Sequence, residues 1–281
     1  MIHTAKQLKD KVRNISKGDN NIAKTLIRNF MMERFLERVS LSRYNDHFIL
    51  KGGMLVASIV GVNMRATMDI DTTVKALPLN EEDIRRIISE ICAIPIEDGV
   101  SFQITSVSNI MEDFEYPGIR LMLEAVLERM RQPIKIDIST DDVITPAAVE
   151  YNYKLMFEER TIMVLSYNKE TLLAEKIQTI LARGIANTRL RDFYDVYEVM
   201  KMCADDVDAG VFREAYEATC TRRDTVFSKD EIKEILDQLK ENEEMRLLWD
   251  RFQEKNYYVE NQMKWQEVLE NIIAVIVTYL M

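Results

Sequence analysis

The sequence is poor in cysteine, glycine and proline, which excludes several classes of protein. It contains 8 Gly, 5 Pro and 3 Cys among 281 residues, so collagen-like, low-complexity and disulfide-rich chains are excluded. The number of cysteines is odd, so they cannot all pair in disulfides, and their spacing is not the C-x-x-C of a zinc site; they are Cys92, Cys203 and Cys220. We therefore expect three reduced, buried thiols.

Long apolar segments are absent as well. No apolar stretch follows the basic N-terminal residues, so we expect no secretory signal. The most apolar segment, Ile272 to Met281, has ten residues, whereas a membrane-spanning helix needs about 20. We expect this segment to form a terminal helix that packs on the core, and we expect a cytoplasmic protein without membrane contact.

Positive charge is scarce overall but concentrated near the N-terminus. The net charge is −10, which argues against a protein that coats nucleic acid by charge alone. Residues 1–43 nevertheless hold ten Lys and Arg against four acids. A solvated helical face and a surface for a phosphate backbone explain this asymmetry equally well, so both interpretations stay open.

The sequence has the composition and periodicity of a helix-rich globular protein, with 47% hydrophobic and 30% charged residues. Helical spacing of apolar residues predicts helices over residues 4–17, 20–39, 54–60 and 79–93. Alternating or β-prone stretches predict strands over residues 48–50, 68–74, 101–108, 118–126 and 134–139. From about residue 169 the pattern is almost entirely helical. We therefore predict an α+β protein with an N-terminal domain over residues 1–150 and a helical domain over residues 151–281.

Asp69 and Asp71 are the first candidates for chemistry. They lie two residues apart on a predicted strand, so both carboxylates project from the same face. Two carboxylates about 4 Å apart repel each other by roughly 4 kcal/mol at an effective dielectric of 20, so a cation is expected between them. Mg²⁺ fits because it prefers hard oxygen ligands. On its own, however, such a pair is more often an exposed edge of a sheet.

Two further features narrow the interpretation. Asp137 is the one acid in the apolar strand Ile134 to Ile138, where an unpaired carboxylate would be costly to bury. Lys51, Gly52 and Gly53 precede a predicted helix, so backbone N–H groups at the helix start can hold phosphate oxygens. A glycine turn, a carboxylate pair and a third strand carboxylate together are a narrower signal than any one of them.

Five stretches carry a family resemblance. They are Met32–Val39, Phe48–Leu55, Arg65–Asp71, Leu172–Ile177 and Arg189–Val196. Together they resemble the AbiEii/AbiGii-type nucleotidyltransferase toxins of bacterial toxin–antitoxin and abortive-infection systems. The resemblance implies a core like that of DNA polymerase β, with a mixed sheet flanked by helices, and a C-terminal all-helical domain that contributes a lysine and an aspartate to the site.

The resemblance also assigns roles to single residues. The glycine motif matches Gly52 and Gly53, although Met54 stands where many related transferases have serine, which removes one hydroxyl ligand for the phosphate. The implied metal ligands are Asp69, Asp71 and Asp137. The implied catalytic residues are Asp69, Asp71, Asp137, Lys176 and Asp192. The implied nucleotide-binding residues are Lys51, Gly52, Gly53, Arg65, Thr67, Lys176, Arg183 and Asp195.

Local patterns agree with the later part of this assignment. Lys176 lies within an apolar stripe of a predicted helix, so we expect it to face a pocket, although a surface lysine whose stem covers apolar residues gives the same pattern. Asp192 and Asp195 lie on the flank of the next helix. One of these acids can instead pair with Arg189 or Arg191, and the pattern does not decide which.

The implied reaction is the transfer of a nucleoside monophosphate from an NTP, with Mg²⁺ or Mn²⁺, to the 3′ end of tRNA, with release of pyrophosphate. A cognate antitoxin would restrain such a toxin. The residues leave other functions open. The overall acidity mildly favours a protein or small-molecule hydroxyl as acceptor. A catalytically inactive module that binds a nucleotide or a partner is a further alternative. A metal-dependent nuclease would also cluster acids, but it would need neither the glycine turn nor the lysine.

Overall fold

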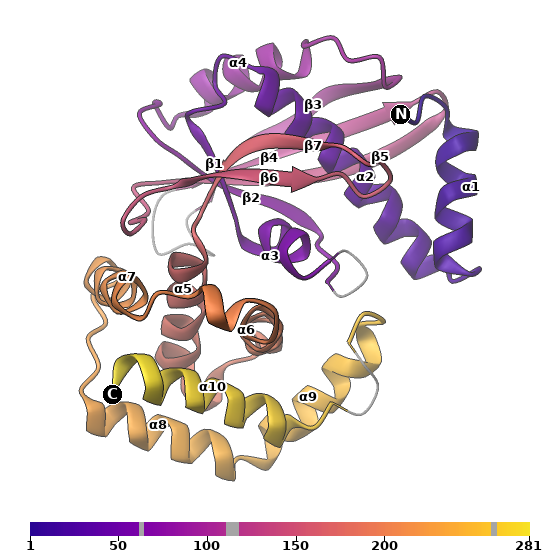
Figure 1. Cartoon of the computed structure of the whole chain (residues 1–281). Helices are drawn as coiled ribbons and strands as arrows, with labels where there is room; N and C mark the ends of the chain where they lie inside the picture. Colours follow the sequence, from indigo (N-terminus) through magenta and orange to yellow (C-terminus); the bar gives the residue numbers. More distant parts are fainter. Residues whose placement is uncertain (62–64, 111–117, 260–262) are drawn as a thin grey trace. The chain divides into compact units, whose positions relative to one another are not determined.

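The computed structural model describes residues 1–61, 65–110, 118–259 and 263–281, which form two compact units (Figure 1). The first unit comprises Met1–Ser58, Ala66–Asp142 and Val149–Ser166. The second comprises Ile59–Arg65, Val143–Ala148 and Tyr167–Met281. Each unit has its own core and is described separately below.

A seven-stranded mixed sheet is the centre of the first unit (Figure 1). Its strands are β1 (Phe48–Lys51), β2 (Asp69–Val74), β3 (Val100–Ile110), β4 (Gly118–Leu127), β5 (Met130–Thr140), β6 (Val149–Lys154) and β7 (Thr161–Ser166). Their order is β3-β4-β5-β2-β1-β7-β6. β2 is parallel to β5 and β1 is parallel to β7, whereas the other neighbours are antiparallel. The first five strands were predicted from the sequence, and β6 and β7 were not.

Four helices belong wholly or mainly to this unit: α1 (Ala5–Ser16), α2 (Asn20–Leu41), α3 (Gly52–Val60) and α4 (Glu81–Cys92). The start of α4 is capped by the Asn80 side chain, which accepts a hydrogen bond from the Asp83 N–H. α2 packs against β5 and β7, α4 packs against β3, and α1 packs on α2. The helices and the sheet thereby enclose an aliphatic core in which strand residues such as Ile70, Leu121 and Ile136 are fully buried.

The last half of α2 carries charged side chains into this core. Arg38 donates hydrogen bonds to both carboxylate oxygens of Asp98, at 2.8 and 3.0 Å. Arg34 lies 3.1 Å from both Glu37 and Glu158. Arg34 and Arg38 are therefore paired in the interior and are not part of an exposed basic surface, which reduces the N-terminal positive charge that an RNA could contact.

A carboxyl group in the same helix is held in its neutral form. Glu33 is almost completely buried, and it accepts hydrogen bonds from the Met156 N–H at 3.1 Å and from the Tyr153 hydroxyl at 3.4 Å. Burial raises the pKa of Glu33 to about 8, although the hydrogen bond from Met156 opposes this shift. Glu33 is therefore mostly protonated at neutral pH.

The second unit is helical, as the sequence predicts for its C-terminal part. Its helices are α5 (Lys169–Arg183), α6 (Leu190–Cys203), α7 (Ala209–Arg222), α8 (Lys229–Glu241), α9 (Glu243–Lys255) and α10 (Trp265–Leu280), with short 3-10 turns at Gly184–Ala186 and Ala204–Asp206. Aromatic contacts join the helices: the ring centroids of Phe193 and Trp265 lie 5.0 Å apart and those of Trp249 and Trp265 lie 5.8 Å apart. The apolar C-terminal segment is part of α10, which buries Ile272 and Ile276.

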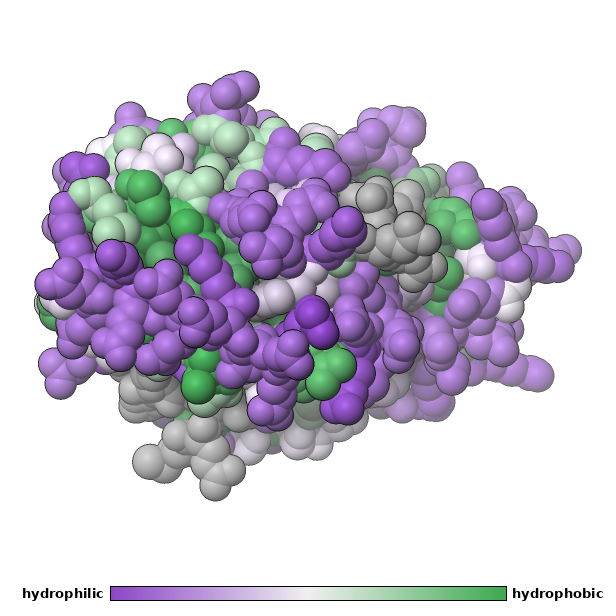
Figure 2. Space-filling model, turned by 90° about the horizontal axis from the view of Figure 1, so that it is seen from below, coloured by the Kyte–Doolittle hydropathy of each residue, from purple (hydrophilic) through white to green (hydrophobic). Residues whose placement is uncertain are grey.

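The prediction of three reduced, buried cysteines is confirmed only in part. All three cysteines are free thiols, but only Cys220 is buried, whereas Cys92 and Cys203 are partly exposed. Within the described ranges, no helix is both long and apolar enough to cross a membrane. Figure 2 shows one face of the molecule, on which hydrophilic residues predominate and apolar residues form separate patches, as is usual for surfaces exposed to water.

Candidate active site

A row of charged residues crosses four neighbouring strands of the sheet. In the strand register Lys51 of β1 lies beside Asp71 of β2, Asp71 lies beside Asp137 of β5, and Asp137 lies beside Arg120 of β4. Residues paired in this way project from the same face of a sheet. Two carboxylates are therefore placed side by side, with a cation at each end of the row.

Asp69 completes a cluster of three carboxylates. One oxygen from each of Asp69, Asp71 and Asp137 can be chosen so that all three lie within 4.8 Å of one another. The spacing of two residues along β2 places Asp69 and Asp71 on one face, and the parallel pairing with β5 brings Asp137 to them. Because carboxylate oxygens are the ligands that Mg²⁺ and Mn²⁺ prefer, the cluster can hold a divalent metal ion.

The electrostatics of the cluster favour an added cation. The pKa of Asp71 is raised to about 6, mainly by burial and also by the nearby charges of Asp69 and Asp137, whereas Lys51 and the Gly53 N–H oppose the shift. An ion with charge +2 among these oxygens would lower the pKa of Asp71 and relieve its repulsion with Asp69 and Asp137.

Two cations beside the cluster were not predicted from the sequence. Arg120 donates from Nε and a terminal nitrogen to the two oxygens of Asp137, at 2.9 and 3.0 Å. Lys135 Nζ lies 2.6 Å from Asp69 Oδ2 and 3.2 Å from Asp137 Oδ2. Lys135 precedes Asp137 by two residues, so the alternation along one strand could have revealed it. Arg120 could not be found in that way because its position depends on the pairing of β4 with β5.

The glycine turn between β1 and α3 is built around Asp71. Gly52 has a φ of +62°, and a Cβ atom added there would lie 2.2 Å from Asp71 Oδ2. The Gly53 N–H donates to the same oxygen at 3.4 Å. Gly52 is therefore required both for its left-handed backbone and for the space that the Asp71 carboxylate occupies. The sequence pattern predicted a tight turn here but did not reveal this contact.

The other predicted residues of the first unit have partners of their own. Lys51 forms an ion pair with Asp142, which also accepts a hydrogen bond from the Ser139 hydroxyl at 2.7 Å. The Thr67 hydroxyl donates to the backbone carbonyl of Asp69 at 3.0 Å. The Thr67 hydrogen bond thus fixes the start of β2, and the ion pair with Asp142 fixes Lys51 at its end of the row.

A second charged cluster, inside the second unit, contains the predicted lysine and both later acids. Lys176 Nζ lies 3.0 Å from Asp192 Oδ1 and 2.7 Å from Asp195 Oδ2, and Lys176 is only 9% exposed. Arg65 Nε donates to Asp195 Oδ1 at 2.6 Å. Lys176 therefore ends in a buried ion-pair network, not in solvent. Both acids pair with Lys176, and Asp192 also lies 3.4 Å from Arg189.

These charges stabilise each other. Burial acts to raise the pKa of Asp195, but Arg65 and Lys176 outweigh it and hold that pKa down at about 2. Burial likewise acts to lower the pKa of Lys176, yet Asp195 and Asp192 raise it above its usual value. Asp195 and Lys176 are thus both ionised at neutral pH. Arg183, at the end of α5, is exposed.

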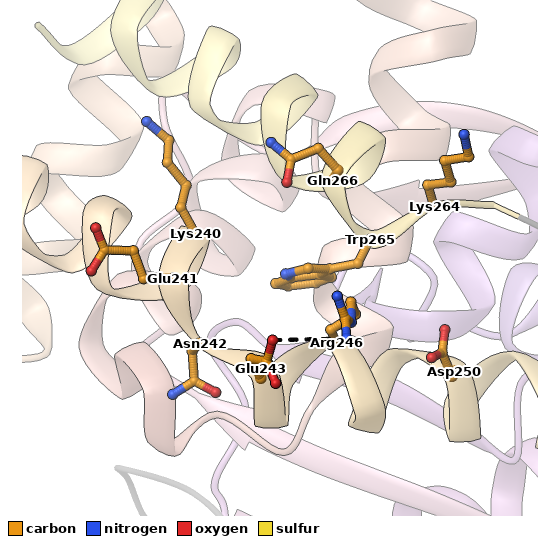
Figure 3. Close-up of a pocket in the computed structure, with 9 residues that line it drawn as sticks. All are labelled: Lys240, Glu241, Asn242, Glu243, Arg246, Asp250, Lys264, Trp265 and Gln266. Atoms are coloured by element: carbon orange, nitrogen blue, oxygen red, sulfur yellow. Dashed lines mark ion pairs between the residues drawn. The ribbon is translucent and has the colours of Figure 1, made fainter.

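A cavity of about 370 Å³ in the second unit is lined by other residues. It lies where the end of α8, the start of α9 and the start of α10 meet, and the Trp265 indole lies between α9 and α10 (Figure 3). Its lining comprises Lys240, Glu241, Asn242, Glu243, Arg246, Asp250, Lys264, Trp265 and Gln266. None of the residues predicted to bind nucleotide or metal is among them, and its charged side chains are balanced in sign.

Comparison with known proteins gives a family and a fold. A family model described as nucleotidyl transferase AbiEii toxin, type IV toxin–antitoxin system, matches residues 34–271. The crystal structure of JHP933 from Helicobacter pylori has a TM-score of 0.52 and 14% identity, with 91% of each chain covered. An antigenic nucleotidyltransferase-like protein from Paracoccidioides brasiliensis has a TM-score of 0.40 and 11% identity, with 86% of this chain and 93% of that one covered. No curated protein matches the sequence. The predicted fold class, a mixed sheet flanked by helices with a helical C-terminal region, is confirmed.

Proposed function

The chain belongs to the AbiEii family of nucleotidyl transferase toxins of type IV toxin–antitoxin systems, and we propose that it transfers a nucleoside monophosphate from an NTP to tRNA with the help of Mg²⁺. The observation that carries this proposal is the meeting of Asp69, Asp71 and Asp137 within 4.8 Å beside a glycine turn. A nucleotidyltransferase needs oxygen ligands for a metal and a place for a triphosphate. The three carboxylates would supply the ligands, and the glycine turn would receive the triphosphate.

The three aspartates would hold the metal ion, and Mn²⁺ would fit the same ligands. Held there, the ion would supply positive charge beside the phosphates of the nucleotide. The donor set suits it, because all three ligands are carboxylates whose oxygens can lie within 4.8 Å of one another. Asp137 is oriented by the two hydrogen bonds from Arg120, and in this proposal it would accept the proton of the attacking hydroxyl or share the metal.

The remaining predicted residues would act on the nucleotide. Lys176 would supply its ammonium group to the phosphates, with Asp192 and Asp195 fixing its position. Arg65 would contribute through Asp195, which it holds by two hydrogen bonds. The N–H groups of Gly52 and Gly53, together with Lys51, Thr67 and Arg183, complete the proposed nucleotide contacts.

The acceptor is proposed to be the 3′ end of tRNA, and modification there would stop translation. Family membership supports a toxic nucleotidyl transfer, and the exposed cations Lys6, Lys9, Lys11, Arg13 and Lys17 on and just after α1 offer a surface for a phosphate backbone. The net charge of −10 favours, as a second candidate, a hydroxyl group of a protein or small molecule. In either case the protein would act in the cytoplasm. A cognate antitoxin would restrain it until phage infection or another stress releases it, and the freed toxin would then abort the infection.

A labelling experiment tests the proposal. The protein is incubated with each of the four labelled NTPs, Mg²⁺ and either total RNA or a protein extract, and the labelled species is identified. Asp69→Asn and Asp71→Asn should abolish labelling without loss of the fold, whereas Asp46→Asn, at an exposed turn position, should label as the parent does. Normal turnover by either Asp69→Asn or Asp71→Asn would refute the assignment of the site, and a labelled protein band in place of tRNA would select the second acceptor.

A further inference from the structure

Lys135 forms salt bridges with two of the three carboxylates in the proposed metal site. Its Nζ atom lies 2.6 Å from Asp69 Oδ2 and 3.2 Å from Asp137 Oδ2. β5 carries both Lys135 and Asp137, and the strand register places Lys135 directly beside Asp69 of β2. Lys135 is thus fixed by the sheet itself at the open side of the cluster, where its side chain is 29% exposed.

The ammonium group and a divalent ion would require the same oxygen atoms. A metal bound by Asp69 and Asp137 needs lone pairs on their carboxylates, and Lys135 engages one oxygen of each. Arg120 already uses both oxygens of Asp137, so few lone pairs remain on that residue. Because two cations cannot share these positions without strong repulsion, Lys135 and the metal should exclude each other.

We infer that Lys135 is a placeholder cation. Its ammonium group neutralises the carboxylate cluster before metal binding, and then turns away from the cluster to form an ion pair with a phosphate oxygen of the incoming nucleotide. This inference rests on the proposed function. It assigns Lys135 a positioning role in the metal-free protein and a substrate contact in the loaded protein. It also predicts that metal and nucleotide bind with positive coupling, since the nucleotide provides the new partner that Lys135 needs.

The neighbouring cations are less suited to this exchange. Arg120 is held by a two-point contact with Asp137, and Lys51 is buried and paired with Asp142. Lys135 instead has a flexible stem, partial exposure and three donors that can turn toward a new acceptor. Among the described cations that border the three carboxylates, Lys135 can therefore leave the cluster with the least rearrangement.

Binding of Mn²⁺ to the metal-free protein is the direct test, because free Mn²⁺ can be measured by electron paramagnetic resonance without any turnover. Lys135→Met and Lys135→Gln remove the charge in two ways, and thermal unfolding establishes that each is folded. Lys154→Met is the matched control, since Lys154 lies on the edge strand β6 and is 68% exposed. We expect both Lys135 variants to bind Mn²⁺ alone at least about tenfold more tightly than the parent and the control.

The nucleotide gives the second half of the test. Calorimetric titration with Mn²⁺ and a non-hydrolysable analogue of the preferred NTP should show binding that is about tenfold weaker in the Lys135 variants, because a phosphate contact is lost. Lys135 variants that bind Mn²⁺ alone no more tightly than the parent would overturn the inference. Asp71→Asn, measured in parallel, separates the two proposals. If it binds Mn²⁺ normally, the proposed metal site itself is wrong, whereas loss of binding leaves only the placeholder role to be judged.

Discussion

Gly52 contributes by the space that it leaves free. Its φ of +62° and the 2.2 Å between an added Cβ and Asp71 Oδ2 mean that Gly52→Ala must displace the carboxylate as well as strain the backbone. We expect transfer activity to fall by about 100-fold and the free energy of unfolding to fall by more than the ~1–2 kcal/mol of a left-handed alanine. Gly18→Ala is the control for strain alone, because Gly18 has a φ of +90° with no atom within 4 Å of an added Cβ. Equal behaviour of the two variants in kinetics and denaturant unfolding would refute the contact.

Glu33 makes stability depend on pH. Its pKa is about 8 in the folded protein and 4.5 in its ordinary state. Between these values the unfolded chain ionises while the folded protein keeps the proton, so the stability that the neutral group contributes is complete below pH 4.5 and is lost as pH rises toward 8. Glu33→Gln cannot ionise and should avoid this loss, so its stability relative to the parent should rise across that range by at most about 5 kcal/mol.

Urea unfolding of both proteins at several pH values between 4.5 and 8 measures this difference. Glu159→Gln is the matched control, because the Glu159 side chain is 95% exposed; its pH profile should follow that of the parent. A constant difference between Glu33→Gln and the parent would show that Glu33 is ionised in the folded protein and that its buried hydrogen bonds hold a carboxylate.

At the scale of elements, α1 carries exposed cations that we propose contact RNA. Its apolar side, with Leu8 and Val12, is buried against the first unit, and its cations are exposed. Replacing four of them by Gln should weaken RNA binding and flatten the dependence of the binding constant on salt, because a complex with fewer phosphate contacts releases fewer counterions when it forms. The four positions are Lys9, Lys11, Arg13 and Lys17.

A matched variant keeps the net charge equal in this measurement. Four exposed lysines of the helical unit, replaced by Gln, change the total charge by the same amount and should leave the salt slope as in the parent. They are Lys201, Lys233, Lys240 and Lys255. Filter binding of tRNA at several salt concentrations gives both slopes. Equal slopes for the two variants would remove α1 from the RNA surface.

Local patterns revealed most of the elements but few of the contacts between them. Alternation along β2 placed Asp69 and Asp71 on one face, and the helical spacing of apolar residues over 79–93 predicted α4. β6 was not recognised because its polar sequence has little apolar alternation, and β7 because it lies in the range that was predicted to be helical. Arg120 escaped notice because strand register decides its position. The Arg34 and Arg38 pairs were also missed, since apolar periodicity does not show that a charged residue within a helix is buried.

For the whole molecule, the path of the chain couples the two units. It passes between them five times, at residues 58–59, 65–66, 142–143, 148–149 and 166–167. Neither unit is one continuous segment, so the loss of one should release segments that anchor the other. We therefore expect a single cooperative unfolding transition.

A core mutation tests this coupling with two signals. Ile136→Ala in β5 should destabilise the first unit by about 2–5 kcal/mol, and Trp249 and Trp265, the protein's two tryptophans, report on the second unit. Far-ultraviolet circular dichroism and tryptophan emission should shift together to lower denaturant concentration. An unchanged emission midpoint would mean that the units unfold independently.

The carboxylate cluster has counter-charges within the protein itself, from Lys51, Arg120 and Lys135. The chain should therefore be able to fold before it binds a metal ion. A zinc finger stays unfolded until its ion arrives, but here a newly translated chain can close its sheet in a cell depleted of divalent cations. Dialysis against a chelator should silence this enzyme and leave it folded, with a melting temperature lower only by the stabilisation that the bound metal supplied. Metal supply would then govern when the toxin acts without affecting how much of it accumulates.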